Sequence, residues 1–197
     1  MLANSSIDNA ASQAKTMFGE ELIWLFIFGD LCTFTLFFFI FGHARTNNSV
    51  LYHASQAKLN VHFGSINTLL LLSSSWFVVR AASAARKGLI QKCTRALAGA
   101  FILGAGFAVF KIIEYIDKAN AGISFSTNDF FLFYYLLTGL HFIHLLTGLS
   151  LIAYFIYNFR ANGITRQNHA TFESGAIFWH MVDLLWIVIF PLLYLLP

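Results

Sequence analysis

The chain has 197 residues, of which 58% are hydrophobic and only 11% are charged, and its mean hydropathy is +0.68. A soluble domain of this size needs more polar surface, so the composition excludes that class and indicates an integral membrane protein. The net charge of +3 does not indicate a nucleic-acid partner, because the basic residues lie at the ends of apolar runs.

The amino-terminal segment, residues 1–18, is polar and rich in Ser, Asn and Ala. It lacks the basic start, short apolar core and cleavage site of a signal peptide. We expect a polar cytoplasmic tail and a first apolar run that is retained.

Five apolar runs are long enough to cross a bilayer as helices, at residues 22–41, 61–82, 96–116, 130–157 and 174–196. Only helices satisfy their backbone within lipid here, so we predict a single all-α membrane domain over residues 1–197. Pro191 predicts a bend near the outer end of the fifth run. The third run carries small residues at every fourth position, which favour close helix packing within the bundle or with another subunit: Ala96, Ala100, Gly104 and Ala108.

The basic residues are distributed unevenly between the two sides of the predicted bundle. One side carries eight, most of them between runs two and three and between runs four and five, and the other carries the remaining four of the 12. The excess of Lys and Arg predicts an amino terminus in the cytoplasm, or its organellar equivalent, and a carboxyl terminus on the outer side. We expect a bacterial inner membrane, in which that outer side is the periplasm.

A set of ionisable residues lies well inside the apolar runs and forms a predicted intramembrane polar network: Asp30, His141, His144, His180 and Asp183. Such groups are expensive at membrane depth and need partners or a function. A rise of about 1.5 Å per residue places them at overlapping depths. We therefore predict that helices four and five pack antiparallel, with these groups turned toward each other or toward helix one.

Two acids are expected at the membrane edges. Glu114 lies near the outer end of run three, where a cap or a salt bridge with Lys111 or Lys118 is expected. Glu173 lies just before run five, where it favours the positive end of the helix dipole.

Several functions fit the polar network from the residues alone. It is interpreted first as a clamp between helices, and a proton-handling or lipid-headgroup site around Asp30 is the next interpretation. Histidine and carboxylate at i, i+3 also occur in metal bundles, and histidines on two helices could hold a haem. The layer lacks the glutamates of di-iron bundles, so we expect no catalytic, cofactor-binding or metal-ligating residue in this chain.

Long segments of the sequence resemble subunit III of the haem-copper oxidases: GDLCTFTLFFFIF, KIIEYIDKANAGISFSTNDFF, YYLLTGLHFIHLLTGL and ESGAIFWHMVDLLWIVIFPLLYL. The chain is similar to the five-helix form, and it looks most like the branch associated with nitric oxide reductase. In the family a membrane carboxylate matches Asp30, the histidine pair matches His141 and His144, and the acid before the last helix matches Glu173. The final helix pattern matches His180 and Asp183.

The resemblance implies a non-catalytic membrane subunit that stabilises a haem-bearing catalytic subunit of a respiratory complex. It implies no cofactor in this chain, haem with copper or non-haem iron in partner subunits, and bound phospholipid. The first alternative is an accessory subunit of nitric oxide reductase. Alternatives of another class are a small proton-conducting or transport protein, and a b-type cytochrome that uses His141 or His144 with His180.

Overall fold

The computed structural model describes the backbone of residues 2–196 and the side chains of residues 24–165 and 168–196. Its elements are all helical and run in the order α1 (Leu2–Asn47), α2 (Ser49–Gln56), α3 (Val61–Arg86), α4 (Ile90–Asn120), α5 (Asp129–Asn162), α6 (Arg166–Phe190) and the π-helical turn η1 (Pro191–Leu195). Five helices are long and apolar enough to span a membrane, with spans at Trp24–Asn47, Val61–Arg86, Ile90–Asn120, Asp129–Asn162 and Asn168–Leu195. The predicted all-α membrane fold with five spans is confirmed.

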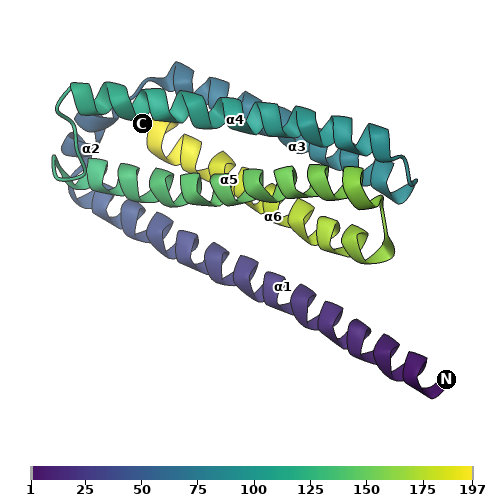
Figure 1. The fold of residues 1–197 in the computed structure, drawn as a ribbon. Coiled ribbons are helices and arrows are strands. Elements are labelled where there is room, and N and C mark those ends of the chain that lie inside the picture. Colours follow the sequence, from purple (N-terminus) through teal and green to yellow (C-terminus); the bar gives the residue numbers. More distant parts are fainter. Residues whose placement is uncertain (1, 197) are drawn as a thin grey trace.

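Helices α3 to α6 form a four-helix bundle, in which each helix packs against its neighbours in the chain and α6 closes the ring against α3 (Figure 1). The α3 and α4 pair makes the most extensive contact. Helix α1 packs outside this ring against α5 and α6. The short connection from Asn162 to Arg166 makes α5 and α6 antiparallel neighbours, as predicted.

Polar residues define where the helices begin. The Asn60 side chain accepts a hydrogen bond from the His62 amide ahead of α3, and Asn128 caps α5 through the Phe131 amide. Thr165 and Asn168 form a reciprocal capping box at the start of α6. Each cap lies before the first residue of the predicted apolar run. A capped helix can begin outside the apolar run, in the polar interface of the membrane.

The observed helices extend beyond most predicted edges. The start of α3 at Val61 agrees with the prediction, whereas α6 begins at Arg166 instead of residue 174. The side chains of the predicted tail, residues 1–18, lie outside the described part of the chain. A bend was predicted at Pro191, and the structure shows a change of helix type there: α6 ends at Phe190, and the Leu196 amide bonds to the Pro191 carbonyl in a wider π-helical turn.

The short helix α2 was not predicted from the sequence. It is held by Tyr52, whose ring is fully buried in edge contacts with Phe41 and Phe130. Burial, together with the nearby Asp129 carboxylate, raises the pKa of the Tyr52 phenol above its usual value. The phenol therefore stays neutral, and α2 ties the end of α1 to the start of α5.

Three members of the small-residue stripe of α4, Ala100, Gly104 and Ala108, are buried inside the bundle, and Ala96 is half-buried. Ala100 is fully buried and its carbonyl accepts a hydrogen bond of 2.9 Å from Ser74 on α3. Gly104 on α4 and Gly148 on α5 both receive the ring of Trp179, and a Cβ atom on either glycine would lie 2.7 Å from that ring. The stripe was predicted to pack either within the bundle or against another subunit. The structure shows packing within the bundle, because the Trp179 indole of α6 fills the notch between Gly104 and Gly148.

Candidate functional site

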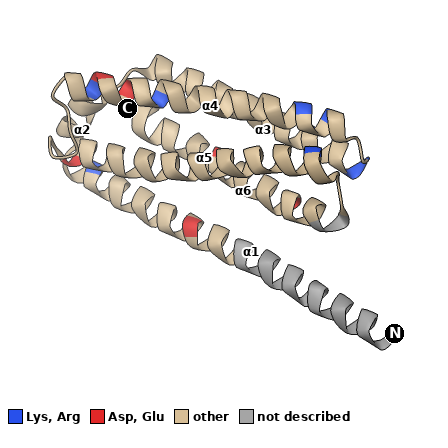
Figure 2. Cartoon of the chain, in the orientation of Figure 1, with Lys and Arg blue, Asp and Glu red and all other residues tan. Residues whose placement is uncertain are grey.

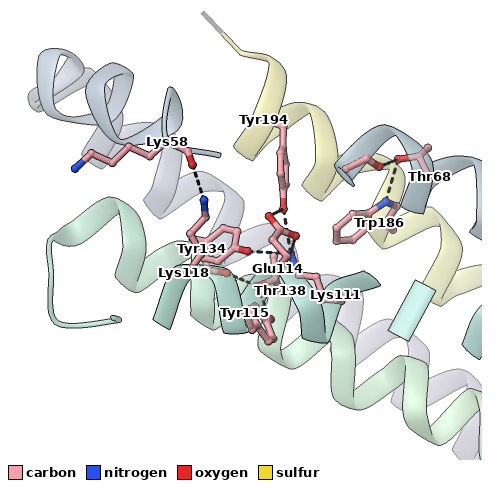
Figure 3. Close-up of polar contacts among 11 residues, drawn as sticks. Lys58, Thr68, Lys111, Glu114, Tyr115, Lys118, Tyr134, Thr138, Trp186 and Tyr194 are labelled. Atoms are coloured by element: carbon pink, nitrogen blue, oxygen red, sulfur yellow. Dashed lines mark hydrogen bonds and ion pairs between the residues drawn. The ribbon is translucent and has the colours of Figure 1, made fainter. Parts of the chain in front are cut away.

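A buried polar cluster joins α4, α5 and the carboxyl-terminal turn (Figure 3). The Lys111 ammonium group donates to Glu114 Oε2 over 2.9 Å, to the Tyr194 hydroxyl over 3.0 Å and to the Tyr134 hydroxyl over 3.2 Å. Tyr194 in turn donates to Glu114 Oε1 over 2.7 Å. The Lys111 and Glu114 side chains are only 1% and 2% exposed. This cluster uses all three ammonium hydrogens and both carboxylate oxygens.

Aromatic rings surround the same ammonium group. Lys111 Nζ lies 4.7 Å from the ring centre of Tyr134, 5.2 Å from that of Tyr115 and 5.4 Å from that of Trp186. Ring faces carry partial negative charge and stabilise a desolvated cation. The ion pair is therefore a neutral and fully satisfied unit, which is the condition under which a charge is tolerated at such burial.

Further hydroxyl bonds extend this end of the bundle. Thr138 donates to the Tyr134 carbonyl over 2.6 Å, so the 2.8 Å contact between Tyr115 and Thr138 has the Tyr115 hydroxyl as its donor. Trp186 donates from Nε1 to the Thr68 hydroxyl over 3.0 Å (Figure 3). Together these bonds fix α4 against α5, and α6 against α3.

Asp30 and His144 form an ion pair between α1 and α5. Oδ2 of Asp30 lies 2.7 Å from Nε2 of His144, and Nδ1 of His144 lies 2.8 Å from the Leu140 carbonyl oxygen. A carbonyl oxygen can only accept, so Nδ1 carries a hydrogen. This contact has the distance of an ion pair but not the geometry of a hydrogen bond, because Asp30 Oδ2 has no hydrogen-bond partner. The predicted turn of His144 toward helix one is confirmed.

His180 and Asp183 do not face α5 or α1, so that part of the predicted network is wrong. Nδ1 of His180 lies 2.6 Å from the Ser75 hydroxyl on α3, and the Asp183 carboxyl group also interacts with Ser75. Oδ1 of Asp183 is buried without a hydrogen-bond partner. The i, i+3 spacing does place both groups on one side of α6, but that side faces α3.

His141 is fully buried and makes ring contacts instead of polar ones. Its ring centre lies 5.7 Å from that of Phe107 and 5.2 Å from that of Trp186. Neither ring nitrogen has a hydrogen-bond partner, and the same is true of both side-chain polar atoms of buried Asn67. The prediction that His141 belongs to one network with Asp183 is therefore wrong.

The two acids expected at membrane edges differ in setting. Glu114 does pair with Lys111, one of its two predicted partners, but it is buried and not near water. Glu173 lies within α6 because that helix begins earlier than predicted, and it pairs with Arg86 on α3 over 3.2 Å. His169 lies 4.0 Å from the same carboxylate oxygen.

Sequence reasoning missed the partners that complete these sets, namely Tyr134, Tyr194 and Ser75. The sequence did contain one indication that Lys111 and Glu114 are buried. They continue the helical spacing of the buried α4 face that contains Ala100, Gly104 and Phe107. In the described part of the chain, no group of three or more His, Cys, Asp or Glu side chains is placed to hold a metal ion.

Three main sets of buried polar groups are centred on Lys111, on Asp30 and on Ser75, and no hydrogen bond or ion pair among the described residues joins one of these sets to another. Each set links two or more helices. Such an arrangement can lock helices in register, whereas a nucleophile with its base or a metal centre would need the groups to converge on one cavity.

Comparison with known proteins gives one consistent result. The family model described as cytochrome c oxidase subunit III matches residues 9–196. The chain is 28% identical to cytochrome bo(3) ubiquinol oxidase subunit 3 of Buchnera aphidicola, over 98% of this chain and 92% of that protein. It is 32% identical to cytochrome c oxidase subunit 3 of Alkalihalophilus pseudofirmus and 30% identical to quinol oxidase subunit 3 of Bacillus subtilis, in each case over 88% of this chain and 84% of the relative.

Proposed function

Because the chain belongs to the cytochrome c oxidase subunit III family, we propose that it is the non-catalytic third subunit of a respiratory haem-copper oxidase-type complex. Its role in that complex is to stabilise the haem-bearing catalytic subunit. The main support for this proposal is the family-model match over residues 9–196, which includes every helix that contains an intramembrane charge.

The geometry supports a scaffold role. The ion pairs within the spans, Lys111 with Glu114 and Asp30 with His144, connect this chain's own groups. Large apolar side chains such as Phe28, Phe39 and Ile102 are instead exposed on the outside of the helices, where lipid or another subunit would cover them. A rigid bundle with an apolar exterior fits a subunit that supports its neighbour within the membrane.

The cofactors of the complex are assigned to the partner subunits. Haem, with copper or non-haem iron, would reside in the catalytic subunit, while this chain would contribute no metal ligand and would bind phospholipid. The separation of its histidines into different sets supports this assignment, because His144 is used by Asp30 and His180 by Ser75.

The placement in the membrane follows from charge. We assign the chain to a bacterial cytoplasmic membrane, with the amino terminus in the cytoplasm and the carboxyl terminus in the periplasm. The excess of Lys and Arg around the turn between α3 and α4 supports that side as cytoplasmic (Figure 2).

We propose oxygen, and not nitric oxide, as the electron acceptor of the complex. The relatives compared above are named as oxidase subunits, which supports an oxidase and gives no support to the expected leaning toward the nitric oxide reductase branch. The same family match favours a complex subunit over a free-standing transporter or b-type cytochrome.

Purification of the chain from its native membrane tests this proposal. An affinity tag is placed at the amino terminus, since the carbonyl of Leu196 at the other end accepts a hydrogen bond from Arg45. Mass spectrometry of the material isolated in mild detergent should identify a haem-copper catalytic subunit in stoichiometric amount. Isolation of the chain alone, or with b- and c-type nitric oxide reductase subunits, would contradict it.

A further inference from the structure

A cationic pocket lies at the turn between α3 and α4, outside all the polar sets described above. It has a volume of about 520 Å³ and is lined by four basic residues, Arg80, Lys87, Lys92 and Arg95, together with Phe77, Ser83, Ala84, Leu89 and Ala96. No acidic side chain lines it. Figure 2 shows Lys and Arg gathered at this end of the two helices.

The four cations of this pocket lack acidic partners within the described residues. Arg86 in the same turn pairs with Glu173 and lines a different groove, between α3 and α6. Arg80 stacks at 4.7 Å over the Trp76 ring. For Lys87, Lys92 and Arg95, the described part of the chain supplies no ion pair. Like charges that share a pocket repel, so an anion bound among them would be stabilised by all four.

The start of α4 adds to the positive potential. Its cap residue, Leu89, lines the pocket and provides no side-chain hydrogen bond to the first turn. The first amides of a long helix carry partial positive charge, and they bind phosphate where no side chain caps them. The basic side chains and the backbone therefore favour the same kind of ligand.

The position of the pocket specifies the source of that anion. It lies where the spans Val61–Arg86 and Ile90–Asn120 meet, which is the level of the lipid headgroups. The neighbouring Trp76 ring is 54% exposed, as is typical of aromatic residues at a membrane interface. Phe77, Ala84 and Ala96 give the same pocket an apolar lining, which suits the glycerol and upper acyl carbons of a lipid but not a free ion.

From this convergence we propose that the pocket between α3 and α4 binds the phosphate group of an anionic phospholipid. Arg80, Lys87, Lys92 and Arg95 contact the phosphate, and the apolar lining holds the start of the acyl chains. The site is distinct from the Asp30 and His144 pair on the other side of the bundle. It rests on the proposed function of a membrane subunit that binds phospholipid, and it gives that binding a place in the fold.

The test compares lipids on the full chain isolated with its copurifying partners. After delipidation in mild detergent, the thermal unfolding midpoint is measured while phosphatidylglycerol, phosphatidylcholine or inorganic phosphate is titrated. A ligand that binds only the folded state raises this midpoint as its concentration exceeds its dissociation constant. Phosphatidylglycerol should raise it at concentrations where phosphatidylcholine and inorganic phosphate do not.

Two double variants identify the site. Lys92→Gln/Arg95→Gln removes two charges from the pocket, whereas Arg86→Gln/Arg160→Gln removes two charges from the same side of the membrane but outside it. The pocket variant should weaken the apparent affinity for phosphatidylglycerol on the order of 30-fold, and the control should change it far less. The charge-conserving Lys92→Arg should retain the wild-type response, which separates charge from folding.

Three results would overturn the assignment. Equal affinity of the pocket variant and the control for phosphatidylglycerol would place lipid binding elsewhere. A full response to inorganic phosphate alone would show an ion site without lipid. Loss of the catalytic subunit from the pocket variant, with an unchanged lipid response, would show that this face docks a protein.

Discussion

Lys111 Nζ and Glu114 Oε2 lie 2.9 Å apart, one helical turn apart on α4, and both side chains are almost completely buried. A charge pair at this burial is held by the hydroxyl groups of Tyr134 and Tyr194, which come from two other elements. The pair therefore couples the packing of α4 to that of α5 and the carboxyl-terminal turn.

Removal of one member of this pair should cost much more than removal of both. Lys111→Met leaves the Glu114 carboxylate buried without its cation, and we expect a loss of about 3–5 kcal/mol in the free energy of unfolding. The double variant Lys111→Met/Glu114→Met removes both charges and should recover most of that loss. Thermal unfolding followed by circular dichroism in detergent measures both.

The control for this prediction is Lys58→Met, because the Lys58 side chain is exposed and only its carbonyl is used, by Lys118. It should leave the midpoint near that of the wild type. If Lys111→Met were as harmless as Lys58→Met, the cluster would contribute nothing to stability.

The Asp30 and His144 pair should tolerate an amide but not an apolar side chain. Asp30→Asn can donate its amide hydrogen to Nε2 of neutral His144, whose Nδ1 hydrogen is already used by Leu140. Asp30→Leu leaves Nε2 without a partner and should cost about 1–3 kcal/mol. Equal unfolding midpoints for the two variants would show that a polar partner for His144 at position 30 has no structural role.

The notch around Trp179 gives a prediction about glycine. Gly104→Ala places a Cβ atom 2.7 Å from the indole, so the ring must move and about 1–3 kcal/mol should be lost. Gly139→Ala on α5 has no atom within 4 Å of the added Cβ and should be neutral or slightly stabilising, since alanine favours a helix. Gly104→Ala should therefore lower the unfolding midpoint, and Gly139→Ala should leave it unchanged or raise it slightly. A midpoint lowered equally by both variants would contradict the packing of Trp179 against Gly104.

The contact between Ser75 and His180 predicts that these two side chains stabilise the packing of α6 against α3. His180→Phe and Ser75→Ala should each loosen the packing of α6 against α3, and their effects should couple by about 0.5–3 kcal/mol in a double-mutant cycle. The same cycle with His144→Phe in place of His180→Phe should be additive, since the polar partners of His144 are Asp30 on α1 and the Leu140 carbonyl of its own helix, and not Ser75. Coupling of Ser75 to His144 but not to His180 would contradict the assignment of His180 to α3.

The spans could be predicted because they depend on local hydropathy, and the start of α3 at Val61 agreed for this reason. The helix ends could not, because capping by Thr165 and Asn168 starts α6 within a polar segment that a hydropathy window excludes. Helix α2 was missed for a related reason: its eight residues are too few and too polar for a span, and tertiary burial of Tyr52 holds it.

The site was predictable in part. Helical rise correctly brought Asp30 to the depth of His144, because depth depends only on position along the helix. It gives no rotation about the helix axis, so the direction of His180 and Asp183 toward Ser75 was missed. The burial of Glu114 depends on Tyr194, which is distant in sequence and reaches it only in the folded bundle.

The most direct test of the proposed role is the reduced-minus-oxidised spectrum of the complex isolated through a tag on this chain, recorded before and after the subunits are separated. We predict haem bands in the intact complex that remain with the catalytic subunit, leaving this chain colourless. A haem band that stays with the separated chain, or a tagged preparation without any haem, would contradict its assignment as a non-catalytic oxidase subunit.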